Sequence, residues 1–272
     1  MNSFLKVLRD VAIFAIAYIV VAIALSLIIK PTDDFNFMLF TLLCGLIVLV
    51  LSGLYEKMVY GRCGAIECKR GGFDARAILW GVIFMVAVSV VLSPLEALLP
   101  TEHQTLPEGG WTMLAAVIIG PILEELIFRG RLISILGYTC RPGLAVVISA
   151  FVFAVAHGNL FVGISAFISG VIFGYFYLLK RSILTPIILH ICNNAVAYSL
   201  IVLSYQDKSV HELIGESKAY YIIYIASWIV VAVGMMHLIR TMYRADSEAT
   251  PCVGAEAAQS NIKIEDDVNS EL

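Results

Sequence analysis

Charged residues are scarce in this 272-residue sequence. Only 14% of its residues are Asp, Glu, Lys or Arg, whereas 60% are hydrophobic. Soluble domains carry about 25% charged residues, so an ordinary water-soluble fold is excluded. The net charge of −3 also lacks the basic excess that marks proteins binding nucleic acids, and no nucleic-acid partner is expected.

Two common metal or redox motifs are missing as well. The sequence contains no His-Glu-x-x-His segment and no Cys-x-x-Cys pair. Its six cysteines are scattered, and four residues separate Cys63 from Cys68 where a zinc knuckle would have two. We therefore expect free thiols and no disulfide framework.

Long apolar runs are what the sequence has instead. A membrane-crossing helix needs about 20 mainly apolar residues. Eight such runs, two of them short, lie at 11–29, 37–54, 77–99, 111–128, 143–157, 160–179, 185–205 and 219–239. The sequence therefore predicts an all-α, polytopic membrane protein with about eight transmembrane helices.

The distribution of Lys and Arg predicts how these helices are oriented. With the N-terminus inside the cell, 15 of the 18 basic residues lie in cytoplasmic connections or tails, and only Lys30, Lys208 and Lys218 lie on the other side. Cytoplasmic loops are enriched in Lys and Arg. We expect a multi-pass protein of the cell membrane with both termini in the cytoplasm and the lipid bilayer as its partner.

A few polar side chains lie within the apolar runs, where a charge is costly and usually functional. They are Glu124, Glu125, Arg129, His157 and His190, accompanied by Asn193 and Asn194. Because they belong to three different runs, they predict a polar cavity inside the membrane. We expect it to open towards the cytoplasm or sideways to lipid.

Helical spacing separates the roles of the two glutamates. Glu125 and Arg129 are four residues apart, so they share a helix face and can form an ion pair. Glu124 points about 100° away and lacks that partner, which suits a general base that activates water. His190 and Asn194 are also four apart and point the same way.

Depth along the helices predicts a mismatch between two of these residues. A helix over 111–128 places Glu124 about 20 Å below the outer surface, nearer the cytoplasmic face than the midplane. His157 lies about 20 Å from the start of its helix at Gly143, roughly 10 Å too far outward to meet Glu124. We expect its helix to start deeper, to tilt, or to end in a water-lined cavity.

Three short motifs occur in order on separate apolar segments: Glu-Glu-x-x-x-Arg at 124–129, Phe-x-x-x-His at 153–157 and His-x-x-x-Asn at 190–194. Together they resemble the CPBP family of CaaX prenyl proteases and bacteriocin-processing (Abi) enzymes, and EELIFRGRL is especially similar. The resemblance implies an intramembrane endopeptidase. Its substrate would be a membrane-associated protein or peptide, prenylated or otherwise lipidated in some members.

The resemblance also implies a role for each motif residue. Glu124 would act as the base, and His157 would orient the attacking water and help to deprotonate it. His190 and Asn194 would form the oxyanion pocket, where donors stabilise developing charge.

The Glu125–Arg129 pair would support this site, and no cofactor is favoured. The favoured mechanism is the glutamate type. The alternative is a metalloprotease in which Glu124, His157 and His190 bind zinc.

Two non-enzymatic functions stay open. Buried Glu–Arg pairs and membrane histidines also occur as plain contacts between helices, so the chain can be an immunity or scaffold protein of the same fold. Carboxylates also serve ion-coupled transporters. The sequence shows no evident inverted repeat, and the predicted cluster lies towards one face, which argues against transport.

Four regions are expected along the chain. Residues 1–110 hold the first transmembrane helices and a basic loop, and 111–205 hold the CPBP-like catalytic core. Residues 206–245 hold the last transmembrane helix. Residues 246–272 are small, polar and acidic, a composition that favours a disordered cytoplasmic tail.

Overall fold

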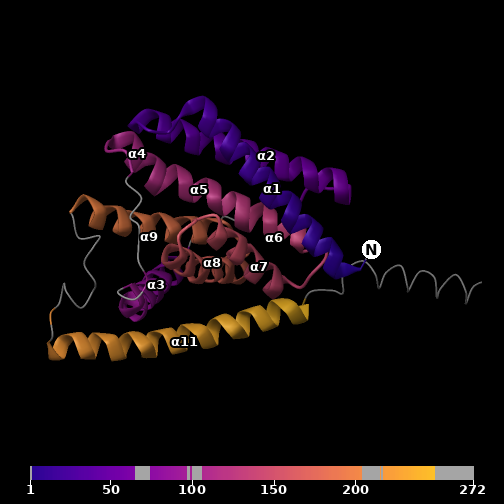
Figure 1. Ribbon diagram of the computed structural model, residues 1–272. Helices are drawn as coiled ribbons and strands as arrows, with labels where there is room; N and C mark the ends of the chain where they lie inside the picture. The colour runs from indigo at the N-terminus through magenta and orange to yellow at the C-terminus, as the bar shows by residue number, and fades with distance from the viewer. Residues whose placement is uncertain are drawn as a thin grey trace, which may run out of the picture.

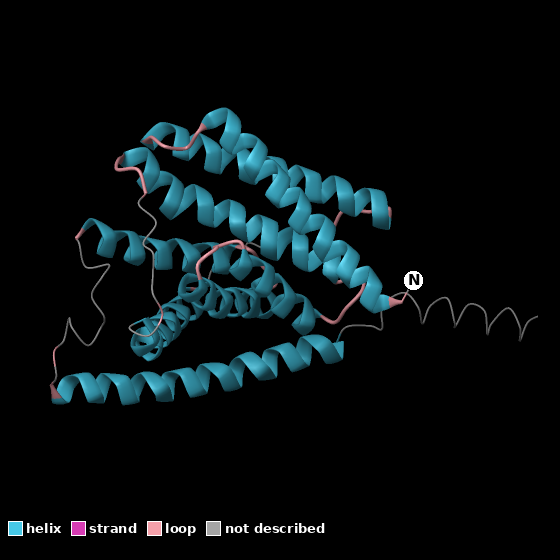
Figure 2. Cartoon of the chain, viewed as in Figure 1, coloured by secondary structure: helices cyan, strands magenta, loops and turns pink. Residues whose placement is uncertain are grey.

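The computed structural model describes residues 2–64, 74–96, 106–203 and 217–248, together with residues 99 and 215. Within these ranges every regular element is helical and no strand occurs (Figure 2). In the part of the chain that the structure describes, seven helices are long and apolar enough to cross a membrane, and an eighth apolar helix is shorter. The prediction of an all-α, multi-pass membrane protein is confirmed.

The membrane helices form one bundle, with α1 and α2 along one side and α11 along the opposite side (Figure 1). In chain order they are α1 (Ser3–Ile29), α2 (Asp34–Tyr60), α3 (Ala75–Glu96), the segment Gly110–Leu136, α7 (Pro142–Val155), α8 (Leu160–Lys180), α9 (Leu184–Val202) and α11 (Lys218–Glu248). The tail predicted over 246–272 lies outside the described residues from position 249 onwards.

The fourth span is one continuous helical segment whose hydrogen-bond register changes repeatedly. It consists of α4 (Gly110–Leu114), π-helical η2 (Ala115–Ile119), α5 (Gly120–Glu125), π-helical η3 (Leu126–Leu132) and α6 (Ile133–Leu136). π-helical turns are rare in proteins, and those that occur frequently lie at functional sites. Glu124 and Glu125 end α5, so the paired glutamates lie at one of these register changes.

This segment is longer than predicted, and its length corrects the depth of Glu124. Glu124 is the fifteenth of 27 residues, so it lies near the middle of the span and not towards one face. It is about 18 Å from Leu136, and His157 is roughly 20 Å from the start of α7 at Pro142. The predicted mismatch in depth between Glu124 and His157 therefore disappears.

Helices α7 and α8 form a tight hairpin joined by residues 156–159. Gly170 and Gly174 lie one turn apart on the face of α8 that contacts α7. A Cβ atom on Gly174 would lie 2.4 Å from Val146 Cγ1, and one on Gly170 would lie 3.0 Å from Ala150 Cβ. Paired small residues let membrane helices approach closely, and this approach holds the end of α7 inside the bundle.

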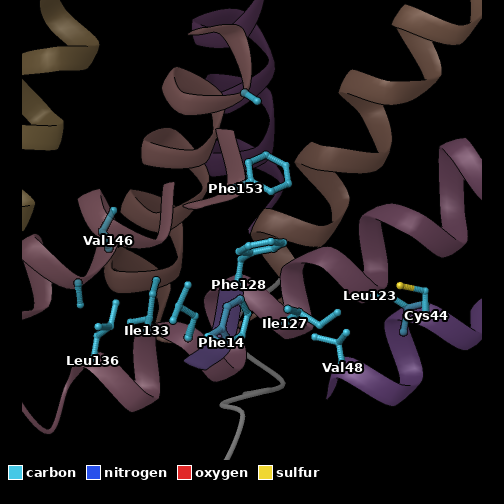
Figure 3. Close-up of a cluster of buried hydrophobic side chains, with 13 residues drawn as sticks. Phe14, Cys44, Val48, Leu123, Ile127, Phe128, Ile133, Leu136, Val146 and Phe153 are labelled. Atoms are coloured by element: carbon cyan, nitrogen blue, oxygen red, sulfur yellow. The ribbon is translucent and has the colours of Figure 1, made fainter. Parts of the chain in front are cut away.

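A column of aromatic side chains connects α1 to the centre of the molecule (Figure 3). Phe14 of α1 packs edge-on against Phe128 of η3, with ring centroids 5.9 Å apart, and Phe128 contacts Phe153 of α7 at 5.0 Å. All three side chains are buried. Phe153 also contacts His157 and His190, so the apolar core reaches the polar residues directly.

The close approach of α7 and α8 predicts that Gly174→Ala destabilises the fold. The added methyl group must displace Val146, and overpacking of this kind costs about 1–3 kcal/mol. Gly110→Ala is the matched control, because no described atom lies within 4 Å of its added Cβ. Reversible unfolding in mixed micelles measures the difference, and equal stabilities of the two variants would contradict the packing described.

Candidate active site

A cavity of about 470 Å³ lies among α3, the fourth span, α7, α8 and α9. Glu124, His157, His190 and Asn194 all belong to its wall. Residues from the three separate motifs therefore meet at one space within the membrane-spanning bundle. Glu125 and Arg129 lie behind this wall, with side chains 0% and 1% exposed.

Glu125 and Arg129 form the ion pair that their spacing indicates, with Arg129 Nη1 2.9 Å from Glu125 Oε1. The guanidinium also lies 4.7 Å and 5.3 Å from the ring centroids of Phe153 and Phe173, where cation–π attraction is favourable. Its Nη2 donates a hydrogen bond to Gly170 O at 3.3 Å. The buried charge is thus compensated from three helices.

His190 links the two glutamates. Its Nδ1 is 2.9 Å from Glu125 Oε1, and its Nε2 is 3.5 Å from Glu124 Oε2. The Glu125 carboxylate, already paired with Arg129, can only accept a hydrogen bond, so Nδ1 carries the proton of that contact. Glu124 stays outside the Glu125–Arg129 pair, but it does have an ionisable neighbour, which the sequence spacing did not reveal.

The two glutamates differ sharply in their access to the cavity. The Glu124 side chain is 33% exposed, whereas that of Glu125 is completely buried. Only Glu124 can therefore meet a water molecule or a substrate without a rearrangement of the protein.

His157 lies in the turn that follows α7. Its Nδ1 is 2.8 Å from Phe153 O, and because a carbonyl oxygen only accepts, Nδ1 is the nitrogen that carries the hydrogen. In the neutral ring Nε2 then has a free lone pair. This residue can therefore accept a hydrogen bond or a proton at the cavity wall.

Asn194 is held by an irregularity of the fourth span. Its Nδ2 donates a hydrogen bond of 2.9 Å to Ala116 O in η2. In the π-helical register the N–H of Gly120 bonds to Ala115 O, and the next residue, Pro121, has no N–H to offer. Ala116 O therefore has no backbone N–H from residue 121 as a partner and accepts the hydrogen bond from Asn194. The second Nδ2 hydrogen of Asn194 can donate to a group in the cavity.

Two further carboxylates are buried that the sequence did not indicate. Each lies at the end of an apolar run, next to a charged or polar residue. Asp10 and Glu56 are both 0% exposed. Glu56 accepts hydrogen bonds from Ser134 Oγ at 2.6 Å and Tyr138 Oη at 3.1 Å, and it pairs with Arg131 at 3.4 Å. This cluster attaches α2 to the end of the fourth span and lies outside the cavity wall.

The zinc alternative involves Glu124, His157 and His190, which all belong to the cavity wall. Among the residues that the structure describes, no three His, Cys, Asp or Glu side chains are grouped as metal ligands. The Nδ1 atoms of His157 and His190 lie at Phe153 O and Glu125 Oε1, which leaves the Nε2 atom of each ring for other partners. The described cysteines Cys44, Cys63 and Cys192 are free thiols; Cys68 and Cys252 lie outside the described residues.

Comparison with known families identifies the segment that builds this site. A family model described as "Type II CAAX prenyl endopeptidase Rce1-like" matches residues 107–196. Residues 107–196 are an Rce1-like domain. The match confirms the resemblance to the CPBP family, and it covers about a third of the chain. No curated protein and no solved structure matched the chain.

The Rce1-like domain contains all seven residues of the three motifs and extends from the loop before α4 into α9. It supports an intramembrane endopeptidase of the CAAX type in general. Helices α1, α2, α3 and α11 lie outside the domain, although α3 contributes part of the cavity wall.

The buried pair predicts that Arg129→Met strongly destabilises the Rce1-like domain. The substitution leaves Glu125 buried without its cation, and breaking a buried pair in this way costs about 3–5 kcal/mol. Arg129→Met combined with Glu125→Leu removes both charges and should recover most of the loss. Unfolding in mixed micelles tests this, and a double variant no more stable than Arg129→Met would contradict it.

Proposed function

We propose that this chain is an intramembrane endopeptidase that hydrolyses a peptide bond of a membrane-associated protein or peptide with a water molecule activated by Glu124 and His157. The observation that carries the proposal is the convergence of the three motifs on one cavity. The Rce1-like match supports the reaction class. The mechanism below is of the glutamate type.

The first step is the activation of water. Glu124 is the carboxylate with access to the cavity, and His157 Nε2 accepts a hydrogen bond from the same water molecule. As the water oxygen bonds to the scissile carbonyl carbon, its proton passes to Glu124 and the carbonyl π electrons move onto oxygen. Positioned bases of this kind contribute about 10²–10⁴-fold to a rate.

The second step is the stabilisation of the oxyanion. The free Nδ2 hydrogen of Asn194 supplies one donor. His190 supplies the other through Nε2, which carries a hydrogen when the ring is protonated at both nitrogens. Glu125 at Nδ1 fixes the orientation of the ring, as partners of functional histidines do. The role of Glu125 and Arg129 is therefore positioning.

The third step is the collapse of the tetrahedral intermediate. The electron pair on the oxyanion re-forms the carbonyl bond, and the carbon–nitrogen bond breaks. The proton held by Glu124 passes to the leaving nitrogen, which departs as an amine. Glu124 is thereby returned to the carboxylate form, and no cofactor is consumed.

The substrate class follows from the position of the site. The cavity lies within the apolar bundle, so its substrates are held at the membrane, and a prenylated CaaX C-terminus is one such class. We also propose that both termini face the cytoplasm, since 15 of the 18 basic residues then lie on that side. A CaaX sequence would approach from the same compartment.

Cleavage assays with purified protein test the proposal. A farnesylated CaaX peptide and a panel of unprenylated peptides are incubated with the wild type and with Glu124→Gln, and products are identified by mass spectrometry. We expect the wild type to cut at least one peptide and Glu124→Gln to lose at least 10²-fold in kcat. If no peptide is cut, or if cutting survives Glu124→Gln, the proposed mechanism is wrong.

A chelator arm separates the glutamate mechanism from the zinc alternative. The proposal expects the cleavage rate to be unchanged after treatment with a strong zinc chelator. Loss of cleavage followed by recovery on addition of zinc would establish the metalloprotease mechanism instead. Peptides that bind without being cut would favour a scaffold or immunity protein, and ion flux abolished by Glu124→Gln in vesicles would favour a transporter.

The contact between Asn194 and Ala116 predicts that Pro121→Ala lowers kcat. The new N–H of residue 121 competes for Ala116 O and loosens Asn194. Asn194→Ala, which removes a donor outright, should cost about 10²–10³-fold, and Pro121→Ala should cost less, with KM little changed in both. Pro142→Ala at the start of α7 is the control. A kcat unaffected by Pro121→Ala would contradict this positioning of Asn194.

A further inference from the structure

The wall of the cavity contains two pairs of serines. Ser89 and Ser93 lie on α3, outside the Rce1-like match, and Ser165 and Ser169 lie on α8. Within each pair the residues are four apart, so both members lie on the same face of their helix. The remaining α3 residues of this wall are apolar: Met85, Val88 and Leu92.

Three of the four serines donate hydrogen bonds within their own helix. Polar residues in membrane bundles usually hydrogen-bond across to a neighbouring helix. Here the hydroxyls of Ser89, Ser93 and Ser169 donate within their own helix, to the carbonyl oxygens of residues 85, 90 and 166, at 3.1, 2.9 and 3.1 Å. The hydrogen of each of these three hydroxyls is therefore occupied, and the lone pairs of the oxygen remain.

A serine whose hydrogen is already donated presents only an acceptor oxygen. Ser89 is exposed and Ser165 and Ser169 are half-buried, whereas Ser93 is only 4% exposed. Asn193 and Asn194 on α9 place amide groups in the same cavity. The cavity thus offers hydrogen-bond acceptors from α3 and α8 and amide groups from α9.

The spacing of the acceptors matches an extended polypeptide. Residues four apart on a helix are displaced by about 6 Å along its axis. In an extended chain the N–H groups that point to one side are two residues apart, about 6.8 Å. A peptide backbone supplies such donors at the required interval, whereas an isoprenoid chain supplies none.

We propose that Ser89 and Ser93 of α3, with Ser165 and Ser169 of α8, bind backbone N–H groups of an extended substrate segment and so position its scissile bond at Glu124. This inference rests on the proposed function and extends it. The segment inside this part of the cavity is polypeptide, and any lipid group of the substrate lies elsewhere. The serines are positioning residues and take no part in the chemical step.

The test combines serine variants with altered peptide backbones. The wild type, Ser89→Ala/Ser93→Ala and Ser165→Ala/Ser169→Ala are assayed with the best-cut peptide of the panel. They are also assayed with analogues in which one N–H at a time, other than that of the scissile bond, is replaced by an ester oxygen. Ser26→Ala on α1, whose hydroxyl also bonds within its own helix, is the matched control.

We expect each double variant to raise KM about 5- to 100-fold, as the loss of two hydrogen bonds implies, with kcat within about twofold. In the wild type, ester replacement at two positions two residues apart should lower kcat/KM about 3- to 10-fold. The same replacements should have little effect in the variant that lacks the matching serines, because the interaction is already absent. Ser26→Ala should behave as the wild type.

The outcomes separate this inference from the function on which it rests. If the wild type cuts peptides but the serine variants keep its KM, or if esters act equally in all variants, the serine inference is wrong and the proposed function stands. If the wild type cuts nothing, the proposed function is wrong. Binding of a farnesylated CaaX peptide and its ester analogues to the wild type then decides the serine inference, and equal affinities would overturn it.

Discussion

Arg129 carries a full positive charge at a position with almost no access to solvent, and the surrounding helices are arranged around its compensation. Glu125 supplies the opposite charge, Phe153 and Phe173 supply ring faces, and Gly170 supplies a carbonyl oxygen. These groups come from the fourth span, α7 and α8. An uncompensated buried charge costs several kcal/mol of folding free energy. The need to compensate Arg129 therefore favours one relative arrangement of these helices.

The same pair determines how the catalytic groups differ. Glu125 Oε1 contacts both Arg129 and His190, so the ion pair in the interior orients a histidine at the cavity wall. Glu124, one residue earlier, escapes that pair and opens to the cavity. Two adjacent residues of the same type thus acquire separate roles from a rotation of about 100° around the helix.

The cavity itself depends on backbone features as much as on charges. The Gly170 and Gly174 contacts hold α7 against α8, and the hairpin ends inside the bundle with His157 at its turn. A missing N–H at Pro121 leaves a carbonyl oxygen for Asn194. Helix α3, which lies outside the family match, contributes both serines and apolar side chains to the cavity wall.

Much of this could be predicted from local patterns, and the errors have one common cause. The predicted fourth span ends at residue 128, whereas the helical segment continues to Leu136, and the local sequence does not reveal that Asp10 and Glu56 are buried. In the folded chain Arg131 pairs with Glu56, a residue of another helix. A charge compensated from a distant part of the chain cannot be distinguished locally from a solvated one.

The sequence by itself determined the helical class, the approximate positions of the spans, the Glu125–Arg129 pair and the family. Each of these depends on composition or on residues a few positions apart, where helical geometry is regular. Only the tertiary structure decided that Glu124 lies at mid-span, that His190 contacts both glutamates, that Asn194 is held by Ala116 and that the serines of α3 and α8 share one cavity. Those facts depend on how separate helices pack, and packing is decided by contacts between residues far apart in the chain.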